Sequence, residues 1–229
     1  SLALSFSLSF FKSGDTTNPS NYRPISILSI LSKPLEKNIN KHILSHFENN
    51  KLTHDNQSGF RQKHSCQTAL ISLVDQWLTN INNNQFCAAL FVDFAKAFDL
   101  IDHKLLIKKL EIYGIATDSI NILKSFLSDR QQSTYLNQSY SCKQTVRFGV
   151  PQGSILGLLL FSIYINDLPL FVKCMCELFA DDTTIHSSHQ DLIKLANILQ
   201  ENIDRLLEWS ELNHMSLNRN KTKCMLLTT

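Results

Sequence analysis

Residues 86–99 read Phe86-Cys-Ala-Ala-Leu-Phe-Val-Asp93-Phe-Ala-Lys-Ala-Phe-Asp99 and are the most informative part of the sequence. Its first seven residues form a short continuous apolar run, which is typical of a strand buried on both faces of a sheet. Asp93 ends the run, and a buried carboxylate is costly unless it is paired or binds a cation. The alternative is that Asp93 caps the N-terminus of a following helix, because Asp is a good N-cap residue.

Helices and strands alternate irregularly around this run. Helices are predicted near 33–50, 65–83, 103–113, 118–128, 154–166 and 190–211. Hairpins are predicted at 132–148, at 175–187 with Asp181-Asp182 at the tip, and around 218–220, with a loop at 12–24 and a turn at 82–84. The pattern indicates an α+β fold with a central antiparallel sheet packed on helices.

Charge is unevenly distributed along the 229 residues, although the net charge is only +2. Residues 1–63 carry eight Lys or Arg against four Asp or Glu, whereas the rest carries fourteen against sixteen. Such a distribution fits a phosphate-contacting region joined to a carboxylate metal site, and it also fits uneven sampling of surface charge. Charge alone leaves both interpretations open.

The chain opens on an apolar segment, residues 1–11, without an initiator Met. No basic residues precede it, no cleavage site follows, and it is too short to span a membrane. We interpret it as a truncated upstream strand or a drifted segment. The six cysteines show no zinc-ligand spacing, so we expect reduced, mostly buried thiols. These features predict an intracellular protein of nucleus or cytoplasm that is not secreted, with no membrane partner and no obligate protein partner.

Three further clusters contain residues suited to chemistry. Phe179-Ala-Asp181-Asp182 places two carboxylates side by side, which a divalent cation would stabilise, although a solvated Asp-Asp turn is common. Gly149-Val-Pro-Gln152-Gly153 allows close backbone approach to a ligand, or forms a tight turn whose helix is capped by Ser154. Leu217–Lys223 forms a basic turn.

The order of these clusters resembles the palm of reverse transcriptases, specifically those of non-LTR, LINE-type retrotransposons of the Jockey-like kind. The matching strings are Asn21-Tyr-Arg-Pro-Ile-Ser26, Ser58-Gly-Phe-Arg61, Val92–Asp99, Gly149–Gly157, Tyr164-Ile-Asn-Asp-Leu168, Phe179–Asp182 and Asn218–Thr222. The resemblance covers roughly residues 12–227. It implies reverse-transcriptase fingers over 12–85 and a palm over 86–229, or one continuous domain over 12–229, with the thumb absent and the chain a fragment.

The resemblance also implies roles for individual residues. Asp93, Asp181 and Asp182 would be the catalytic carboxylates that bind two Mg²⁺ ions, with Mn²⁺ a substitute, and Lys221 would donate a proton to the leaving pyrophosphate. The nucleotide would be contacted by Arg61, Lys63, Phe98, Gln152 and Gly153, with Phe98 excluding a 2′-hydroxyl. Gln152 and Arg23 would contact the template or primer. The implied partners are an RNA template, a DNA primer and dNTPs.

Two positions depart from the family pattern. Leu158 stands where the family usually has Pro, and Phe179 stands where many relatives outside the LINE group have Tyr. Neither departure changes a carboxylate. Two alternatives to an active retrotransposon enzyme stay open: a non-catalytic relic or domesticated nucleic-acid-binding module, and a group II intron maturase-like or telomerase-like reverse transcriptase.

Overall fold

The computed structural model describes residues 4–11, 14–18, 21–59, 61, 64–136 and 139–228. The chain forms two compact units, one of residues 1–52 and 101–163 and the other of residues 53–100 and 164–229. The main chain therefore passes between the units three times. The unit boundaries do not coincide with residue 85, and the assignment of fingers and palm stays a prediction.

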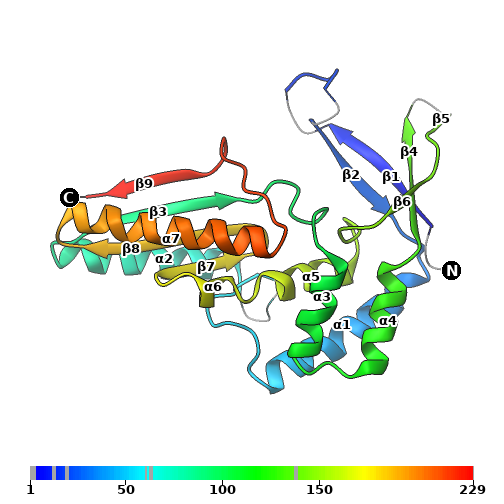
Figure 1. Cartoon of the computed structure of the whole chain (residues 1–229), viewed down its shortest axis with the longest axis horizontal. Helices are drawn as coiled ribbons and strands as arrows, with labels where there is room; N and C mark the ends of the chain where they lie inside the picture. The colour runs from blue at the N-terminus through cyan, green and yellow to red at the C-terminus, as the bar shows by residue number, and fades with distance from the viewer. Residues whose placement is uncertain are drawn as a thin grey trace. The chain divides into compact units, whose positions relative to one another are not determined.

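The second unit is built on an antiparallel sheet that contains the apolar run as an inner strand (Figure 1). In the described residues its strand order is β7 (Met175–Phe179), β8 (Asp182–His189), β3 (Phe86–Asp93) and β9 (Lys223–Leu227). Strand β3 is thus paired on both edges. Hydrogen bonds on both sides satisfy its backbone N–H and C=O groups, as the burial of the strand requires.

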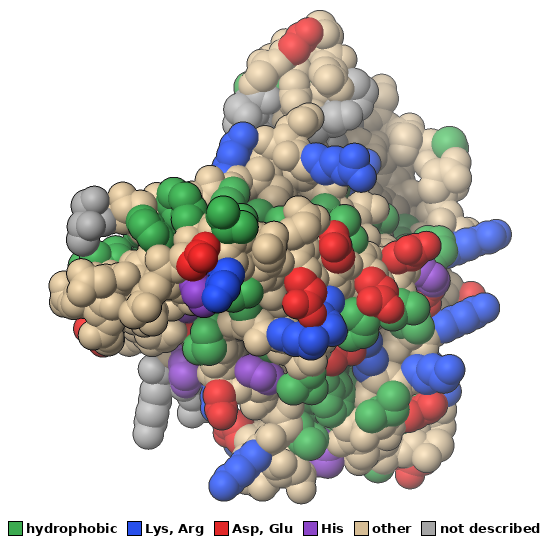
Figure 2. All heavy atoms as spheres, turned by 60° about the vertical axis from the view of Figure 1, so that its left-hand side comes forward, with side chains coloured by type: hydrophobic (Ala, Val, Ile, Leu, Met, Phe, Trp, Pro, Cys, Tyr) green, Lys and Arg blue, Asp and Glu red, His purple; other side chains and the backbone are tan. Residues whose placement is uncertain are grey.

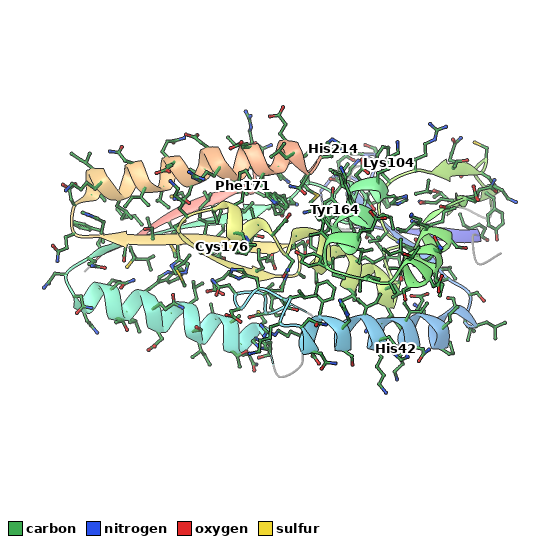
Figure 3. The ribbon with its side chains drawn as sticks, turned by 60° about the horizontal axis from the view of Figure 1, so that its bottom comes forward. His42, Lys104, Tyr164, Phe171, Cys176 and His214 are labelled. Carbon is green, nitrogen blue, oxygen red and sulfur yellow. The ribbon has the colours of Figure 1, made fainter. Side chains whose placement is uncertain are left out.

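Two helices cover the two faces of this sheet, α2 (Cys66–Asn82) and α7 (Leu192–Leu212), as Figure 3 shows. Cys87 and Ala89 of β3 pack with Leu73 and Trp77 of α2. Ala88, between them in sequence, packs with Leu195 and Leu199 of α7. Because successive strand residues point to opposite faces, both faces need apolar side chains, and this explains the uninterrupted apolar run.

Capping side chains fix where these helices begin. Ser65 and Thr68 form a reciprocal capping box at the start of α2, and Asp191 accepts hydrogen bonds from two backbone N–H groups at the start of α7. The short helix α6 (Leu168–Phe171) precedes β7. Tyr164, near the end of α7 in Figure 3, is fully buried and donates its hydroxyl proton to the Asn213 carbonyl at 2.6 Å.

The first unit combines a second sheet with four helices of the described chain. The sheet runs β2 (Tyr22–Ile27), β1 (Leu4–Phe11), β4 (Arg130–Leu136) and β5 (Ser139–Tyr140), with β6 (Gln144–Val146) also on β4. Strands β1 and β4 are parallel. The helices are α1 (Ser32–Asn49), α3 (His103–Ile112), α4 (Thr117–Leu127) and α5 (Ile155–Ile165), and Leu106, Leu110 and Leu123 are among their fully buried residues.

Most predicted elements are confirmed, and four details are wrong. The turn before β8 is Ala180-Asp181, so Asp182 already belongs to the strand. The predicted loop 12–24 gives way to β2 at Tyr22. Around 218–220 there is a turn without a hairpin, because β9 pairs with β3. The cysteines are free as expected but not mostly buried: Cys87 and Cys176 are buried, whereas Cys66, Cys142 and Cys224 are exposed.

The charged side chains on one face of the molecule are of both signs. On the face shown in Figure 2, Lys and Arg side chains are interspersed with Asp and Glu. Within the described part of the chain, none of the helices combines the length and the apolar character needed to cross a bilayer.

His186 on β8 gives the fold a testable pH dependence. Burial lowers the pKa of its imidazole to about 4, against about 6.5 in an unfolded chain. The unfolded state therefore binds the proton more readily, so stability present above pH 6.5 is lost as pH falls toward 4. We expect this residue to contribute a loss of roughly 2–3 kcal/mol in unfolding free energy over that window.

Urea unfolding of the wild type and of His186→Leu at several pH values measures this contribution as a difference. The apolar variant keeps a side chain beside Trp77, whose ring centroid lies 6.1 Å from that of His186. Identical pH slopes for the two proteins would contradict the prediction.

Candidate functional site

Strands β3 and β8 bring two carboxylates from distant parts of the sequence into one position. Their antiparallel register pairs Phe86 with His189 at one end and Asp93 with Asp182 at the other. Residues directly opposite each other in an antiparallel pair point to the same face, with Cβ atoms roughly 4.5–5.5 Å apart. The side chains of Asp93 and Asp182 therefore lie side by side at the end of the ladder.

Asp181 is held beside this pair by a tight two-residue turn. Phe179 pairs with Asp182 across the turn, and Ala180 adopts a left-handed backbone conformation, φ +56°. Two-residue hairpins favour positive φ because their twist then matches that of the strands. A small Ala accepts this conformation with less strain than a β-branched residue would.

A separate segment, residues 56–59, forms backbone hydrogen bonds with the outer edge of β7. We call this segment the clamp. Ser58 N–H donates to the Leu178 carbonyl at 2.8 Å, and Leu178 N–H donates to the Asn56 carbonyl at 2.9 Å. Gly59 then passes so close to the turn that a Cβ on it would stand 2.4 Å from the Ala180 nitrogen. Only glycine allows this approach, so the Asp181 turn depends on residue 59.

Asp93 is fixed from the opposite side by the segment before β9. Its carbonyl accepts from Asn218 N–H at 2.8 Å, and its own N–H donates to the Thr222 hydroxyl at 3.3 Å. The next helix, α3, is capped by Asp102, whose carboxylate accepts from the N–H groups of Lys104 and Leu105. The interpretation of Asp93 as a helix cap is therefore wrong, and its carboxylate has no role at a helix start.

Electrostatics at this site favour a bound cation. Partial desolvation, and after it the negative charges of Asp181 and Asp93, raise the pKa of the Asp182 carboxyl. Three like charges repel one another, and a divalent cation would relieve this repulsion. Within the described residues, no three acidic, His or Cys side chains already lie close enough together to form a complete metal site. The carboxylates nevertheless suit Mg²⁺, which takes few protein oxygens and completes its shell with water and substrate phosphates.

The glycine-containing loop, residues 149–153, lies in the first unit and is held by many hydrogen bonds. The Gly149 carbonyl accepts from His103 at 2.8 Å and from the buried Arg130 at 3.0 Å. Gln152 is half-buried, and its carbonyl accepts from Ser26 N–H at 2.9 Å. Gly153 adopts φ +106°, and a Cβ there would stand 3.2 Å from the Ser26 carbonyl oxygen. Gly153 thus comes close to the protein's own strand β2.

The other predicted site residues come from separate segments of the chain. Phe98 is half-buried in the turns after β3, and Lys221 is exposed in the turn before β9. Arg61 donates to the Asp55 carbonyl at 3.3 Å, which ties its guanidinium to the segment preceding the clamp. Arg23 lies on β2, and its side chain is outside the described residues, as is the whole of Lys63.

Two residues at these sites were not predicted from the sequence. Gly59 lies in the string Ser58–Arg61 that resembles the family. Nothing in the sequence around it indicates that it contacts Ala180. Glu36 is 2% exposed and accepts hydrogen bonds from the start of α5. The signal for Glu36 was available, because this acid shares the buried face of its helix with Ile43 and Phe47.

An antiparallel sheet with one carboxylate at the end of an inner strand and two at an adjoining hairpin is the arrangement of a palm-type polymerase. The model of the family "Reverse transcriptase (RNA-dependent DNA polymerase)" matches residues 12–228. The chain belongs to this reverse transcriptase family.

Relatives from Drosophila melanogaster specify the kind of reverse transcriptase. The chain is 34% identical to "Probable RNA-directed DNA polymerase from transposon BS" over 222 residues, 93% of this chain and 24% of that protein. It is 33% identical to "Probable RNA-directed DNA polymerase from transposon X-element" over 215 residues, 92% of this chain and 24% of that protein. It is a reverse transcriptase domain of the non-LTR retrotransposon type, and it spans about a quarter of the length of these relatives.

Solved structures support the fold at lower identity. The structure of telomerase from Candida albicans in complex with a fragment of telomeric RNA aligns with 99% of this chain and 42% of that chain, with a TM-score of 0.69 and 14% identity. This similarity confirms the α+β reverse-transcriptase fold.

The clamp at Gly59 predicts a specific loss of stability. In Gly59→Ala the added Cβ would collide with the backbone of the Asp181 turn, and we expect unfolding free energy to fall by about 1–3 kcal/mol. Hydrogen exchange at the Leu178 amide should accelerate, because this amide bonds to the clamp. Ser58→Ala is the matched control, since it keeps the backbone hydrogen bond to Leu178. Equal stability of the two variants in urea unfolding would contradict the role of the close approach.

Proposed function

We propose that this chain carries the nucleotidyl-transfer centre of an RNA-directed DNA polymerase, with Asp93, Asp181 and Asp182 as the metal ligands. The observation that carries the proposal is the register of β3 and β8, which sets Asp93 opposite Asp182 beside the Asp181 turn. Bound Mg²⁺ would stabilise the charge that develops on the transferred phosphoryl group. Mn²⁺ would replace it with the same oxygen ligands.

The chain's own residues would bind and orient the substrates. The proposed substrates are an RNA template, a DNA primer and dNTPs. Phe98 would restrict the space beside the sugar, because a planar ring has little freedom to move aside. Arg61 would contact phosphate, which suits a guanidinium. The exposed Lys221 would supply a proton to the leaving pyrophosphate. Lys63 and Arg23 remain proposed contacts of nucleotide and template.

Neutralising single carboxylates separates catalysis from binding. We expect Asp93→Asn or Asp181→Asn to reduce metal-dependent primer extension by at least about 10²–10³-fold, because a preorganised charge-stabilising group is lost. RNA affinity should change little, since it depends on phosphate contacts by Lys and Arg. Primer extension with Mg²⁺ or Mn²⁺, beside filter binding of RNA on the same proteins, measures both quantities.

Two Asp variants serve as controls for this experiment. Asp75→Asn removes one exposed charge from α2, and Asp99→Asn removes a carboxylate six residues after Asp93; both should retain most extension. Retained extension in Asp181→Asn, or equal losses in Asp93→Asn and Asp99→Asn, would show that the ligands are wrongly assigned. RNA binding without metal-dependent extension by the wild type would instead identify a non-catalytic nucleic-acid-binding module.

Sugar selection tests the role of Phe98. Removing its ring in Phe98→Ala opens space for a 2′-hydroxyl, so ribonucleotide incorporation should rise by about tenfold or more relative to deoxynucleotide incorporation. Competition between an rNTP and the matching dNTP in primer extension gives the ratio. Phe98→Tyr is the control that keeps the ring. An unchanged ratio in Phe98→Ala would leave Phe98 as a packing residue only.

A further inference from the structure

Helix α5 begins with a cap that comes from another helix. The Glu36 carboxylate of α1 accepts hydrogen bonds at Oε2 from the Ser154 hydroxyl at 2.6 Å, from Ile155 N–H at 2.8 Å and from Leu156 N–H at 3.4 Å. Its Oε1 accepts from the Ser32 hydroxyl at 3.0 Å. All four donors reach one carboxylate, so Glu36 is satisfied inside the protein.

The hydrogen bonds of Glu36 are buried, so losing them would cost stability. Glu36 and Ser154 are each 2% exposed, and Ser32 is 6% exposed. A buried carboxylate is tolerated only when hydrogen bonds compensate its lost hydration, and the start of a helix provides such donors together with a positive end of the dipole. Removing the carboxylate would leave several buried donors without an acceptor, which is costly.

The same contact sets the position of the preceding loop. Ser154, which bonds to Glu36, directly follows Gln152 and Gly153. Lys33, one turn before Glu36 on α1, donates from Nζ to the Gly153 carbonyl. Helix α1 therefore anchors both the end of the loop and the start of α5. Helix α5 itself begins at Ile155, directly after this anchored segment.

The cap also determines what this helix end can bind. Unpaired N–H groups at a helix start attract phosphate. Here Ile155 and Leu156 already donate to Glu36, and Gly157 N–H donates to the Ser154 hydroxyl at 3.1 Å. An incoming triphosphate would find these donors used and would face a carboxylate of its own sign. The loop would then contact a nucleic acid or nucleotide through Gln152 and its neighbouring backbone, and not through the N–H groups of this helix end.

We propose that Glu36 is a positioning residue for Gln152: it fixes the loop at the start of α5 and excludes phosphate from this helix end, so that the loop meets the templating base. This inference rests on the proposed polymerase function. Glu36 touches no substrate, and it acts through the loop it holds.

The test uses a primer–template whose templating base is 4-thiouridine, bound to the 229-residue chain and photo-crosslinked. Mass spectrometry of the crosslinked peptide measures the yield at residues 149–157. We expect the yield to fall about tenfold in Glu36→Ala, as displacement of a positioned group by about 1 Å can cause. Glu36→Gln should be intermediate, because its amide oxygen still accepts a backbone N–H. Total RNA affinity, from filter binding, should stay within about twofold in both, since phosphate contacts provide it.

The matched control is Glu48→Ala, which removes an exposed carboxylate from the same helix and should crosslink like the wild type. If Glu36→Ala fails to fold by circular dichroism, Glu36→Gln alone decides, and a wild-type yield in that variant overturns the inference. A wild type that extends primers but crosslinks outside 149–157 overturns the inference and leaves the polymerase function standing. A wild type that binds RNA but neither extends nor crosslinks at the loop overturns both.

Discussion

The hydrogen-bond register between β3 and β8 is the constraint on which the carboxylate site depends. A sheet alternates its side chains with a period of two, so a slip by one residue would turn Asp182 away from Asp93 and would also move the apolar residues of β3 to the wrong faces. The register is therefore fixed by burial as much as by the backbone. Ala88 packs with α7 and Cys87 with α2, which orients β3 between the helices, and the β3–β8 register then sets Asp93 opposite Asp182.

The carboxylate site and the glycine-containing loop are each held in place by hydrogen bonds from segments that are distant in the sequence. The Asp181 turn is held by residues 56–59, and Asp93 is held by Asn218 and Thr222. The glycine loop of the first unit is held by β2 and α1, through Ser26, Lys33 and Glu36. Turns and loops have few contacts of their own, so a precise geometry there requires partners from rigid elements. Glycine at 59 and 153 permits these partners to come close.

Local patterns predicted most of the fold because local chemistry sets most of it. The apolar spacing along α1 and α2, the unbroken apolar run of β3 and the Ser154 cap all depend on residues a few positions apart. The predictions were wrong where a segment pairs with a part of the chain that is distant in the sequence. A hairpin was expected around 218–220, but β9 found its partner in β3, some 130 residues earlier in the chain. The exposure of Cys66, Cys142 and Cys224 likewise depends on neighbours that composition does not specify.

Motif order and apolar periodicity were enough to predict the fold class, the family and the acids that we propose as metal ligands, because both are features of the linear chain. Only the tertiary structure decided which acids adjoin, that Asp93 does not cap a helix, and that Gly59 and Glu36 support the site regions. The physical reason is that hydrogen bonds and close packing act over a few ångströms in space, whereas Glu36 and Ser154 are separated by 118 positions in the chain. The helical spacing of Glu36 with Ile43 and Phe47 indicates that Glu36 is buried, but it does not indicate that Ser154 is its partner.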